Sequence, residues 1–207
     1  MLLITAAIAL AISAIRPNGR FNWLMETLPA IVGGLLLAAT YRRFRFTTLV
    51  YLLAWVYALV MITGGHYTYA EVPLGNWARD AFGLSRNHFD RIGHFLQGLV
   101  PALFARELLL RTSPLRPCKW LAFICICIAL GVSAGYELFE WQYAVLFGGQ
   151  KANDFLGSQG DIWDAQKDMF MALIGALAAL LLSPLQDHQL RCLQQAGPRT
   201  VQPEAAE

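Results

Sequence analysis

The sequence predicts an all-α fold, a polytopic membrane helix bundle with about six transmembrane helices. Three observations lead to this prediction. Of the 207 residues, 57% are hydrophobic and only 14% are charged, whereas soluble domains carry about 25% charged residues. The mean hydropathy is +0.45. The apolar residues also form long runs, and a membrane-spanning helix needs about 20 of them because the hydrocarbon core is about 30 Å thick.

The same composition excludes several classes of protein. A disordered chain has the opposite bias, toward charge and away from apolar residues. A soluble enzyme of this size has more surface than so few charges can cover. The formal net charge is +2, which provides no electrostatic footprint for nucleic acid. We therefore expect the lipid bilayer to be the partner of this chain, and no nucleic acid.

Six apolar runs have the length, or nearly the length, of membrane helices. The first is short, the second contains the charged residue Glu26 near its start, and the third contains no charge. We expect helices because they satisfy their own backbone hydrogen bonds, which lipid cannot do for them. The runs are Leu2–Ile15, Leu24–Tyr41, Thr47–Gly64, Ile92–Leu110, Trp120–Phe147 and Met169–Leu185.

The first run allows two interpretations. It is apolar and ends at Arg16, so it resembles the apolar region of a signal peptide. A secretory signal has basic residues before that region, and this chain has none there. A short first membrane helix is therefore the favoured interpretation, and a cleaved signal peptide is the alternative.

The basic residues predict the orientation of the bundle. Short cytoplasmic loops carry an excess of Lys and Arg, and two short connections of a six-helix chain, both on one side, are basic. We therefore expect both connections and both termini in the cytoplasm, with residues 1–185 as the transmembrane bundle and 186–207 as a polar cytoplasmic tail. The basic residues of the two connections are Arg42, Arg43 and Arg45, and Arg111, Arg116 and Lys119.

This topology places the longest connections, 65–91 and 148–167, at the outer face, where unusual polar residues gather. Several of them share a helix face, because Asp90 and His94 are four residues apart and Glu137 and Glu140 are three apart. Asp161, Asp164 and Asp168, just before the last run, follow one helical stripe. The candidate polar site comprises His66, Glu71, Asp90, His94, Glu137, Glu140, Asp161, Asp164 and Asp168.

Carboxylates that lie close together repel one another, so a cation, protons or Arg and Lys must neutralise them. A divalent metal held by carboxylates and imidazole on facing helices is one solution. Ionisable groups are also costly at membrane depth, by at least about 2.5 kcal/mol at the centre of a span, which makes them candidates for function. The residues that would hold the metal are His94, Glu137, Glu140, Asp164 and Asp168.

Structural interpretations of the same residues stay open. The first two acids of the stripe are placed to cap the last helix, since acids stabilise a helix N-terminus. Glu137 and Glu140 are alternatively expected to pair with Arg91 or Lys167, and Arg106 with Glu107 forms a local or interhelical charge pair. Two pairs of small residues predict close helix packing, namely Gly131 with Gly135 and Gly175 with Ala179.

Four segments resemble the YjdF family of bacterial inner-membrane proteins over nearly the whole chain. They are His66-Tyr-Thr-Tyr-Ala-Glu-Val-Pro-Leu-Gly75, Ser85-Arg-Asn-His-Phe-Asp-Arg-Ile-Gly-His-Phe95, Tyr136-Glu-Leu-Phe-Glu-Trp141 and the segment 154–169. The resemblance implies a multi-pass protein of the bacterial cytoplasmic membrane and no particular reaction.

A second set of residues is similar to VanZ-like membrane proteins. It comprises Arg91-Ile-Gly-His94-Phe95, then Glu137, then Asp168-x-x-x-Ala172-x-x-Gly175. The chain departs from that pattern at Ala172, where the pattern has Asn. This similarity implies a role at the cell envelope, with lipid or lipid-linked substrates.

Three functions fit these observations. The first is a carboxylate and histidine site at the outer face that binds a divalent cation or a lipid headgroup. The second is a small proton-coupled transporter, although the chain lacks the inverted repeat that carriers often show. The third is a non-catalytic membrane protein that stabilises a partner. The sequence contains no nucleophile elbow, HExxH, P-loop or dinucleotide motif, so it indicates neither an enzyme class nor an oligomeric state.

Overall fold

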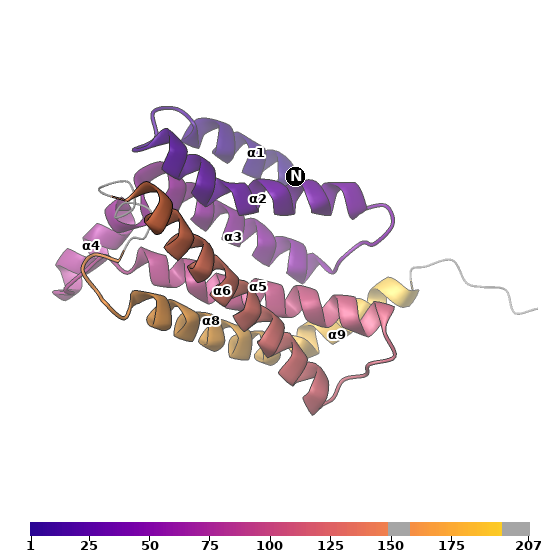
Figure 1. Cartoon of the computed structure of the whole chain (residues 1–207). Coiled ribbons are helices and arrows are strands. Elements are labelled where there is room, and N and C mark those ends of the chain that lie inside the picture. The colour runs from indigo at the N-terminus through magenta and orange to yellow at the C-terminus, as the bar shows by residue number, and fades with distance from the viewer. Residues whose placement is uncertain (149–157, 196–207) are drawn as a thin grey trace, which may run out of the picture.

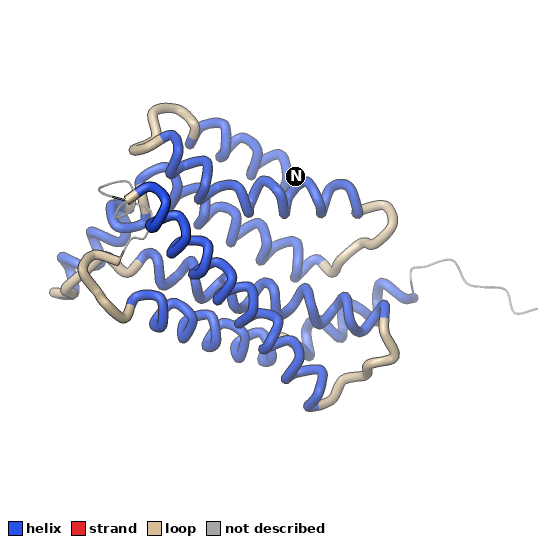
Figure 2. Tube along the Cα trace, in the orientation of Figure 1, coloured by secondary structure: helices blue, strands red, loops and turns tan. Residues whose placement is uncertain are grey.

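The computed structural model describes residues 1–148 and 158–195, and within them the chain is a helical bundle (Figures 1 and 2). The described residues contain no strand, so the predicted all-α bundle is confirmed. The elements in order are α1 (Leu2–Ser13), α2 (Arg20–Thr40), α3 (Thr48–Tyr67), the 3-10 turn η1 (Tyr69–Glu71), α4 (Pro73–Phe82), α5 (Phe89–Thr112), α6 (Lys119–Phe147), α8 (Asp164–Leu181) and α9 (Ser183–Gln195).

Three helices, α2, α3 and α6, are long and apolar enough to cross a membrane. The pair α8 and α9 counts as a fourth if it forms one bent span. Helix α1 has 12 residues and reaches only part of the way along α2 (Figure 1). At 1.5 Å per residue it is about 18 Å long, well short of the hydrocarbon core. The number of membrane spans, predicted as six, therefore stays a prediction.

The last predicted run, Met169–Leu185, crosses a break in the helix, so its predicted end is wrong. Helix α8 stops at Leu181, and α9 leaves at 53° to it. Pro184 explains the break, because its ring fixes φ and its nitrogen cannot donate to the preceding turn. Residues 186–195 of the predicted polar tail belong to α9, which begins at Ser183, and residues 196–207 lie outside the described part.

The two ends of the bundle take their names from the short helices that lie there. At the α4 end, α3 and α6 finish and α5 and α8 begin; the α9 end is the opposite one (Figure 1). Both basic connections lie at the α9 end, where Arg111 Nη1 donates to the carbonyl oxygen of Arg45 at 2.6 Å. The prediction that the two basic connections share one side is confirmed, while the side of the membrane stays a prediction.

Helices α5 and α8 pack with almost no space between their backbones. A Cβ on Gly98 would lie 1.8 Å from the carbonyl oxygen of Ala172, and a Cβ on Gly175 would lie 1.9 Å from that of Phe95. Close packing at Gly175 is therefore confirmed. A Cβ on Gly131 or Gly135 would have no neighbour within 4 Å, so the prediction that they pack closely is wrong within the described part of this chain. The α5–α8 contact fixes which acids of α8 face which bases of α5.

An apolar layer separates the two ends of the bundle. Its buried residues come from the connection before α3 and from α3, α5, α6 and α8, and small side chains among them allow the helices to approach. Residues on α5 between its polar ends belong to this layer, so the buried polar groups of α5 are confined to its two ends. The buried residues of the layer are Phe46, Val50, Leu99, Val100, Ala102, Leu103, Ala129, Ala176 and Ala179.

Helix α4 lies within the connection 65–91, which was expected to be a loop. It begins with Pro73 in its first turn and ends at Gly83, whose φ of +62° is left-handed. Proline is favoured at the first helical position and glycine just past the last one. These two residues therefore define a short helix where the surrounding polar residues suggest a loop.

Candidate functional site

A buried asparagine fixes the loop before α5. Asn87 is fully buried, and its Nδ2 donates to the carbonyl oxygens of Ala70 and Val72 at 3.1 and 3.0 Å. Its Oδ1 accepts from the backbone N–H of Phe89 at 3.0 Å, at the start of α5. A Cβ on Gly75 would lie 1.8 Å from that Oδ1, so a larger residue at 75 would displace the amide. The loop therefore holds the start of α5 in one orientation.

Two buried arginines bind the aspartates around the start of α8. Arg86 Nη1 donates to Asp164 Oδ1 at 2.6 Å, and Arg91 Nη2 donates to the same oxygen at 2.5 Å. Arg91 Nη1 also donates to Asp168 Oδ1. Asp161 Oδ2 lies 3.6 Å from each guanidinium. Removing either arginine would leave buried carboxylates uncompensated, which is a strongly destabilising change.

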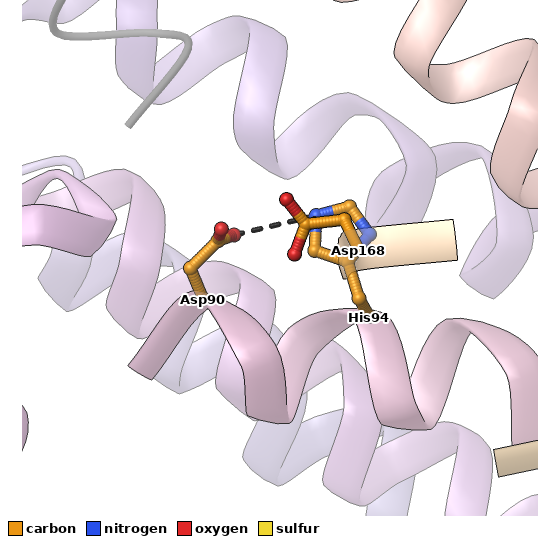
Figure 3. Close-up of side chains that lie close together, drawn as sticks. All are labelled: Asp90, His94 and Asp168. Atoms are coloured by element: carbon orange, nitrogen blue, oxygen red, sulfur yellow. Dashed lines mark ion pairs between the residues drawn. The ribbon is translucent and has the colours of Figure 1, made fainter. Parts of the chain in front are cut away.

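His94 lies beside this network, between two carboxylates. Asp90 and His94 extend from α5, and Asp168 of α8 lies against them (Figure 3). His94 Nε2 is 3.4 Å from Asp90 Oδ1 and 3.6 Å from Asp168 Oδ1. All three residues are buried, and one ligand atom of each lies within 4.8 Å of the others. The two separations exceed the usual hydrogen-bond distance of about 2.7–3.2 Å.

Gln97 orients the histidine ring. His94 Nδ1 lies 2.9 Å from Gln97 Oε1. Because an amide oxygen can only accept, Nδ1 carries a proton. When the ring is neutral, Nε2 therefore presents its lone pair toward the two carboxylates. Metal-binding histidines show this arrangement, with one ring nitrogen on the metal and the other donating to a fixed acceptor.

Helix α6 adds two acids to the cluster. Glu137 Oε1 lies 3.6 Å from His94 Nδ1, and this buried oxygen has no hydrogen-bond partner among the residues that the structure describes. The side chain of Glu137 is 9% exposed, and Glu140 is 8% exposed. A buried polar atom without a partner is costly and requires an explanation such as a bound ion or proton. Asp90, His94, Asp168 and Glu137 are called the acid–histidine cluster below.

Groups from α2 and η1 surround the cluster, and they were not among the predicted site residues. Tyr136 donates its hydroxyl to Oε2 of the buried Glu26 at 3.2 Å. The ring of Tyr69 occupies the space next to two glycines: a Cβ on Gly64 would lie 2.4 Å from it, and one on Gly93 3.2 Å. Glu26 is the single acid of its apolar run, which was the available signal. The other residues that were missed are Arg86 and Gln97.

Outside the membrane helices, the electrostatics of three groups follow from their neighbours. The hydrogen bond from Lys167 lowers the pKa of Asp161. Burial, together with the neighbouring Arg86 and Arg91, lowers the pKa of His88. Burial raises the pKa of Tyr69 well above its ordinary value, and the acid that contributes most to this is Glu26. Tyr69 is therefore a neutral hydroxyl at physiological pH.

Five of the nine candidate residues lie outside the four that form the acid–histidine cluster, namely His66, Glu71, Glu140, Asp161 and Asp164. His66 Nδ1 is 2.7 Å from the carbonyl oxygen of Ser13, so it connects α3 to α1. Glu71 is exposed in η1. Asp161 precedes α8 and pairs with Lys167 at 2.6 Å. Asp164, predicted to be a metal ligand, binds two arginines instead of facing His94.

The expected structural pairings of other charges also differ from the observed contacts. Arg91 pairs with aspartates of α8, and among the described residues neither Glu137 nor Glu140 forms an ion pair with it. Arg106 and Glu107 do not pair with each other in the described part of the chain. Arg106 Nη2 donates to Asp187 of α9 at 2.7 Å, and Glu107 accepts from Arg111 at 2.9 Å.

The cluster has the dimensions of a metal site. A tetrahedral ion with bonds of about 2.1 Å places its ligand atoms about 3.4 Å apart. The separations of His94 Nε2 from the two aspartate oxygens, 3.4 and 3.6 Å, are of this size. One imidazole and several carboxylates suit divalent transition metals. The same groups are able to hold protons, because each has a titratable atom in a confined space.

The fold and the site define a helical membrane protein with a buried acid–histidine cluster near one end. The chain belongs to the family described as "Predicted membrane protein (DUF2238)", which matches residues 1–188. It is 48% identical to "Inner membrane protein YjdF" of Escherichia coli (strain K12) over 189 residues, which cover 91% of this chain and 90% of that protein.

The predicted membership of the YjdF family is therefore confirmed, together with the inner-membrane class of the protein. No solved structure matches the chain. The similarity to VanZ-like proteins stays a prediction.

Proposed function

We propose that this membrane protein binds one divalent transition-metal ion, such as Zn²⁺ or Mn²⁺, at the α4 end of the bundle. Asp90, His94 and Asp168 bind the ion, while Glu137 lies on the other side of the imidazole, 3.6 Å from its Nδ1. The observation that carries the proposal is the position of His94. Its Nε2 faces two carboxylate oxygens at 3.4 and 3.6 Å, while Gln97 holds its Nδ1 at 2.9 Å.

The balance of buried charge supports a cation. Six carboxylates at the α4 end have buried side chains, and two buried guanidiniums accompany them. With His94 neutral and all six acids ionised, four negative charges are in excess, which a divalent ion reduces to two. The six carboxylates are those of Glu26, Asp90, Glu137, Glu140, Asp164 and Asp168, and the guanidiniums are those of Arg86 and Arg91.

The position of the site in the membrane is also a proposal. With six spans, the basic connections at the α9 end lie in the cytoplasm together with both termini, and the metal site lies near the outer face. A reporter that is active only in the periplasm tests this orientation. Fused after residue 207, the reporter should be inactive. Activity there would show that the bundle has the opposite orientation in the membrane.

Proton-coupled transport is the second candidate, and Glu137 supports it because its unpartnered oxygen is able to take up a proton. The apolar layer opposes it, since buried polar residues on α5 stop before Leu99 and resume at Arg106. A transport pathway requires polar groups or water to continue across this layer. The metal site requires only the groups at the α4 end and is therefore preferred.

Elemental analysis of detergent-purified protein tests the metal site. After loading with Zn²⁺ or Mn²⁺ and removal of excess metal, the wild type should retain about one ion per chain. His94→Ala should retain less than a tenth of that amount. Glu71→Gln is the matched control, because it removes an exposed acid at the same end of the bundle. Equal metal contents in the wild type and His94→Ala would reject the proposed function.

A further inference from the structure

The first turns of α2 lie against the last turns of α6 at the α4 end of the bundle (Figure 1). Two contacts fix how these helices face each other. The rings of Phe21 and Tyr143 stack with their centroids 5.7 Å apart, and the hydroxyl of Tyr136 donates to Glu26 Oε2 at 3.2 Å. The earlier residue of α2 thus meets the later residue of α6, so the helices run antiparallel here. A residue one turn before Glu26 therefore lies level with a residue one turn after Tyr136.

Two further polar side chains occupy these two positions. Asn22 lies four residues before Glu26, and Glu140 lies four residues after Tyr136. Residues four apart share a helix face, so each continues the polar stripe of its neighbour. Asn22 and Glu140 are both buried, with 8% of their surface exposed. The facing stripes of α2 and α6 therefore bring two acids and an amide to one place in the bundle.

Asn22 points into the bundle and has no partner there. Helix α2 contacts α6 through Phe21 and contacts α3 through Thr27, whose Cγ2 would lie 3.0 Å from a Cβ on Gly65. Asn22 and Glu26 lie on the face of α2 between these two contacts. Both amide atoms of Asn22, Oδ1 and Nδ2, are buried and have no hydrogen-bond partner among the described residues. Such atoms are costly and indicate an additional ligand at the site.

The two acids of this site lack a positive partner. Glu26 is 2% exposed, and the hydroxyl of Tyr136 donates to it. In the described part of the chain, neither Glu26 nor Glu140 forms an ion pair with an arginine or a lysine. The charged groups that act most strongly on Glu140 are other acids, with Glu137 first among them. Buried carboxylates without compensation are strongly destabilising, so these acids require a cation of their own.

The charge count at the α4 end gives the size of that cation's charge. Six buried acids and two guanidiniums leave four negative charges, and the ion at His94 reduces them to two. A second divalent ion removes the remaining two. This step assumes the ion at His94, so the inference rests in part on the proposed function.

The donor atoms indicate which divalent ion fits. Two carboxylates and an amide supply oxygen ligands only, which suits hard cations such as Mg²⁺ and Ca²⁺. Three ligand atoms lie within 4.8 Å of one another at Asp90, His94 and Asp168, and the described acids of α2 and α6 are more widely spaced than this. An ion between α2 and α6 must therefore keep some of its waters. Mg²⁺ dehydrates reluctantly and usually binds through one or two carboxylates and several waters.

We propose that a partly hydrated Mg²⁺ ion binds between α2 and α6, held by Glu26, Glu140 and the amide oxygen of Asn22. This site has no nitrogen ligand and lies beside the proposed site at His94. The two sites therefore select different metals, a transition metal at the imidazole and Mg²⁺ between the two helices.

Equilibrium dialysis of detergent-purified, Zn²⁺-loaded protein against millimolar Mg²⁺ tests the proposal, with elemental analysis of both metals. The wild type should hold about one Mg²⁺ per chain in addition to its Zn²⁺. Glu26→Gln and Glu140→Gln should each weaken Mg²⁺ binding roughly 10-fold or more, because each removes a full charge from a buried site. Both variants should keep the Zn²⁺. Glu71→Gln is the matched control, because it removes an exposed acid at the same end.

Asn22→Leu distinguishes a ligand from a structural residue. The substitution keeps a side chain of similar size and removes two buried polar atoms without partners, so thermal unfolding should show a variant at least as stable as the wild type. It should nevertheless weaken Mg²⁺ binding about threefold or more, because the ion loses one oxygen ligand. Unchanged Mg²⁺ binding in any of the three variants would overturn the proposed ligand set.

The two metals separate this inference from the proposed function. Wild-type protein that retains Zn²⁺ but binds no Mg²⁺ would overturn the site between α2 and α6 and leave the proposed function standing. Wild-type protein that binds Mg²⁺ but retains no Zn²⁺ would reject the proposed function, while the Mg²⁺ site remains. Loss of Mg²⁺ in His94→Ala together with full Mg²⁺ binding in Glu140→Gln would place the Mg²⁺ at His94 and overturn the inference.

Discussion

Helix α5 carries buried charge near both of its ends, and the two ends are paired very differently. Near the α9 end, Glu107 is fully buried and accepts hydrogen bonds from several donors. These include the N–H of Thr47 at 3.0 Å, its hydroxyl at 2.7 Å and Arg111 at 2.9 Å. Gln186 of α9 also approaches it at 3.4 Å. This carboxylate needs no further partner.

Near the α4 end, the acids outnumber the donors that reach them. Asp164 is bound by two guanidiniums, while Glu137 Oε1 has no hydrogen-bond partner among the described residues. The comparison teaches that burial of an acid does not by itself indicate function. A fully bonded carboxylate stabilises the fold, whereas an excess of acids around one oriented imidazole supports the proposed binding of a cation.

The largest expected effect on stability is at the α9 end. Glu107→Ala should lower the free energy of unfolding by about 3 kcal/mol, because it leaves Arg111 and the N–H of Thr47 without their buried acceptor. Thermal unfolding in detergent measures the change. Asp80→Ala is the control, since its pair with Arg79 is exposed and should contribute less than about 1 kcal/mol. Equal effects of the two substitutions would remove the contrast between the ends.

Gln97→Leu should weaken metal binding by about 10- to 100-fold, which is the usual effect of removing the acceptor that orients a metal-binding histidine. The metal ligands themselves stay in place, so about one ion should still bind at saturation. Calorimetric titration measures the affinity. The comparison would fail if Gln97→Leu bound metal as tightly as the wild type.

Glu137→Gln sharpens the comparison, because it removes a charge without changing the shape of the side chain. With no metal bound, the variant should be as stable as the wild type or more stable by up to about 1 kcal/mol in its free energy of unfolding. The reason is that the substitution removes the charge from a buried acceptor that has no hydrogen-bond partner. Metal affinity should fall. A destabilisation as large as that of Glu107→Ala would show that both acids are structural.

The smallest expected effect concerns pH. Because the pKa of His88 is lowered from 6.5 in the folded chain, the unfolded chain binds more protons below that pH, and the stability contribution of the neutral ring is lost as pH falls. Between pH 7.5 and 5.5 the melting temperature of the wild type should therefore fall more than that of His88→Gln. Parallel curves for the two proteins would contradict this assignment.

Much of the fold could be predicted from apolar runs, and the errors have local causes. The start of α5 at Phe89 precedes the predicted Ile92, at the point where the Asn87 side chain accepts from the N–H of Phe89. Helix α4 was missed because a ten-residue amphipathic helix has too few apolar residues to stand out in a polar connection. The break at Leu182 was visible only as Pro184 within an apolar run.

The site was predicted only in part. The spacing of residues along a helix determines which of them share a face, but it does not determine how one helix is positioned along its neighbour. Asp90 and His94 had to share a face of α5. The choice of Asp168 over Asp164 as the neighbour of His94 depends on the register of α8, which Gly98 and Gly175 set by backbone contact. His66 lies apart from the cluster because its face of α3 is turned toward α1, where its Nδ1 is 2.7 Å from the carbonyl oxygen of Ser13. No local pattern predicts which face of α3 meets α1.

X-ray absorption of the bound ion is the most direct measurement of the central claim. For Zn²⁺ in the wild-type protein, we predict a shell of oxygen and nitrogen ligands at about 2.0–2.1 Å with the scattering of one imidazole. In His94→Ala loaded at high metal concentration, the imidazole contribution should be gone. An oxygen-only shell in the wild type, or the same imidazole signal in His94→Ala, would contradict the assignment of the metal to this cluster.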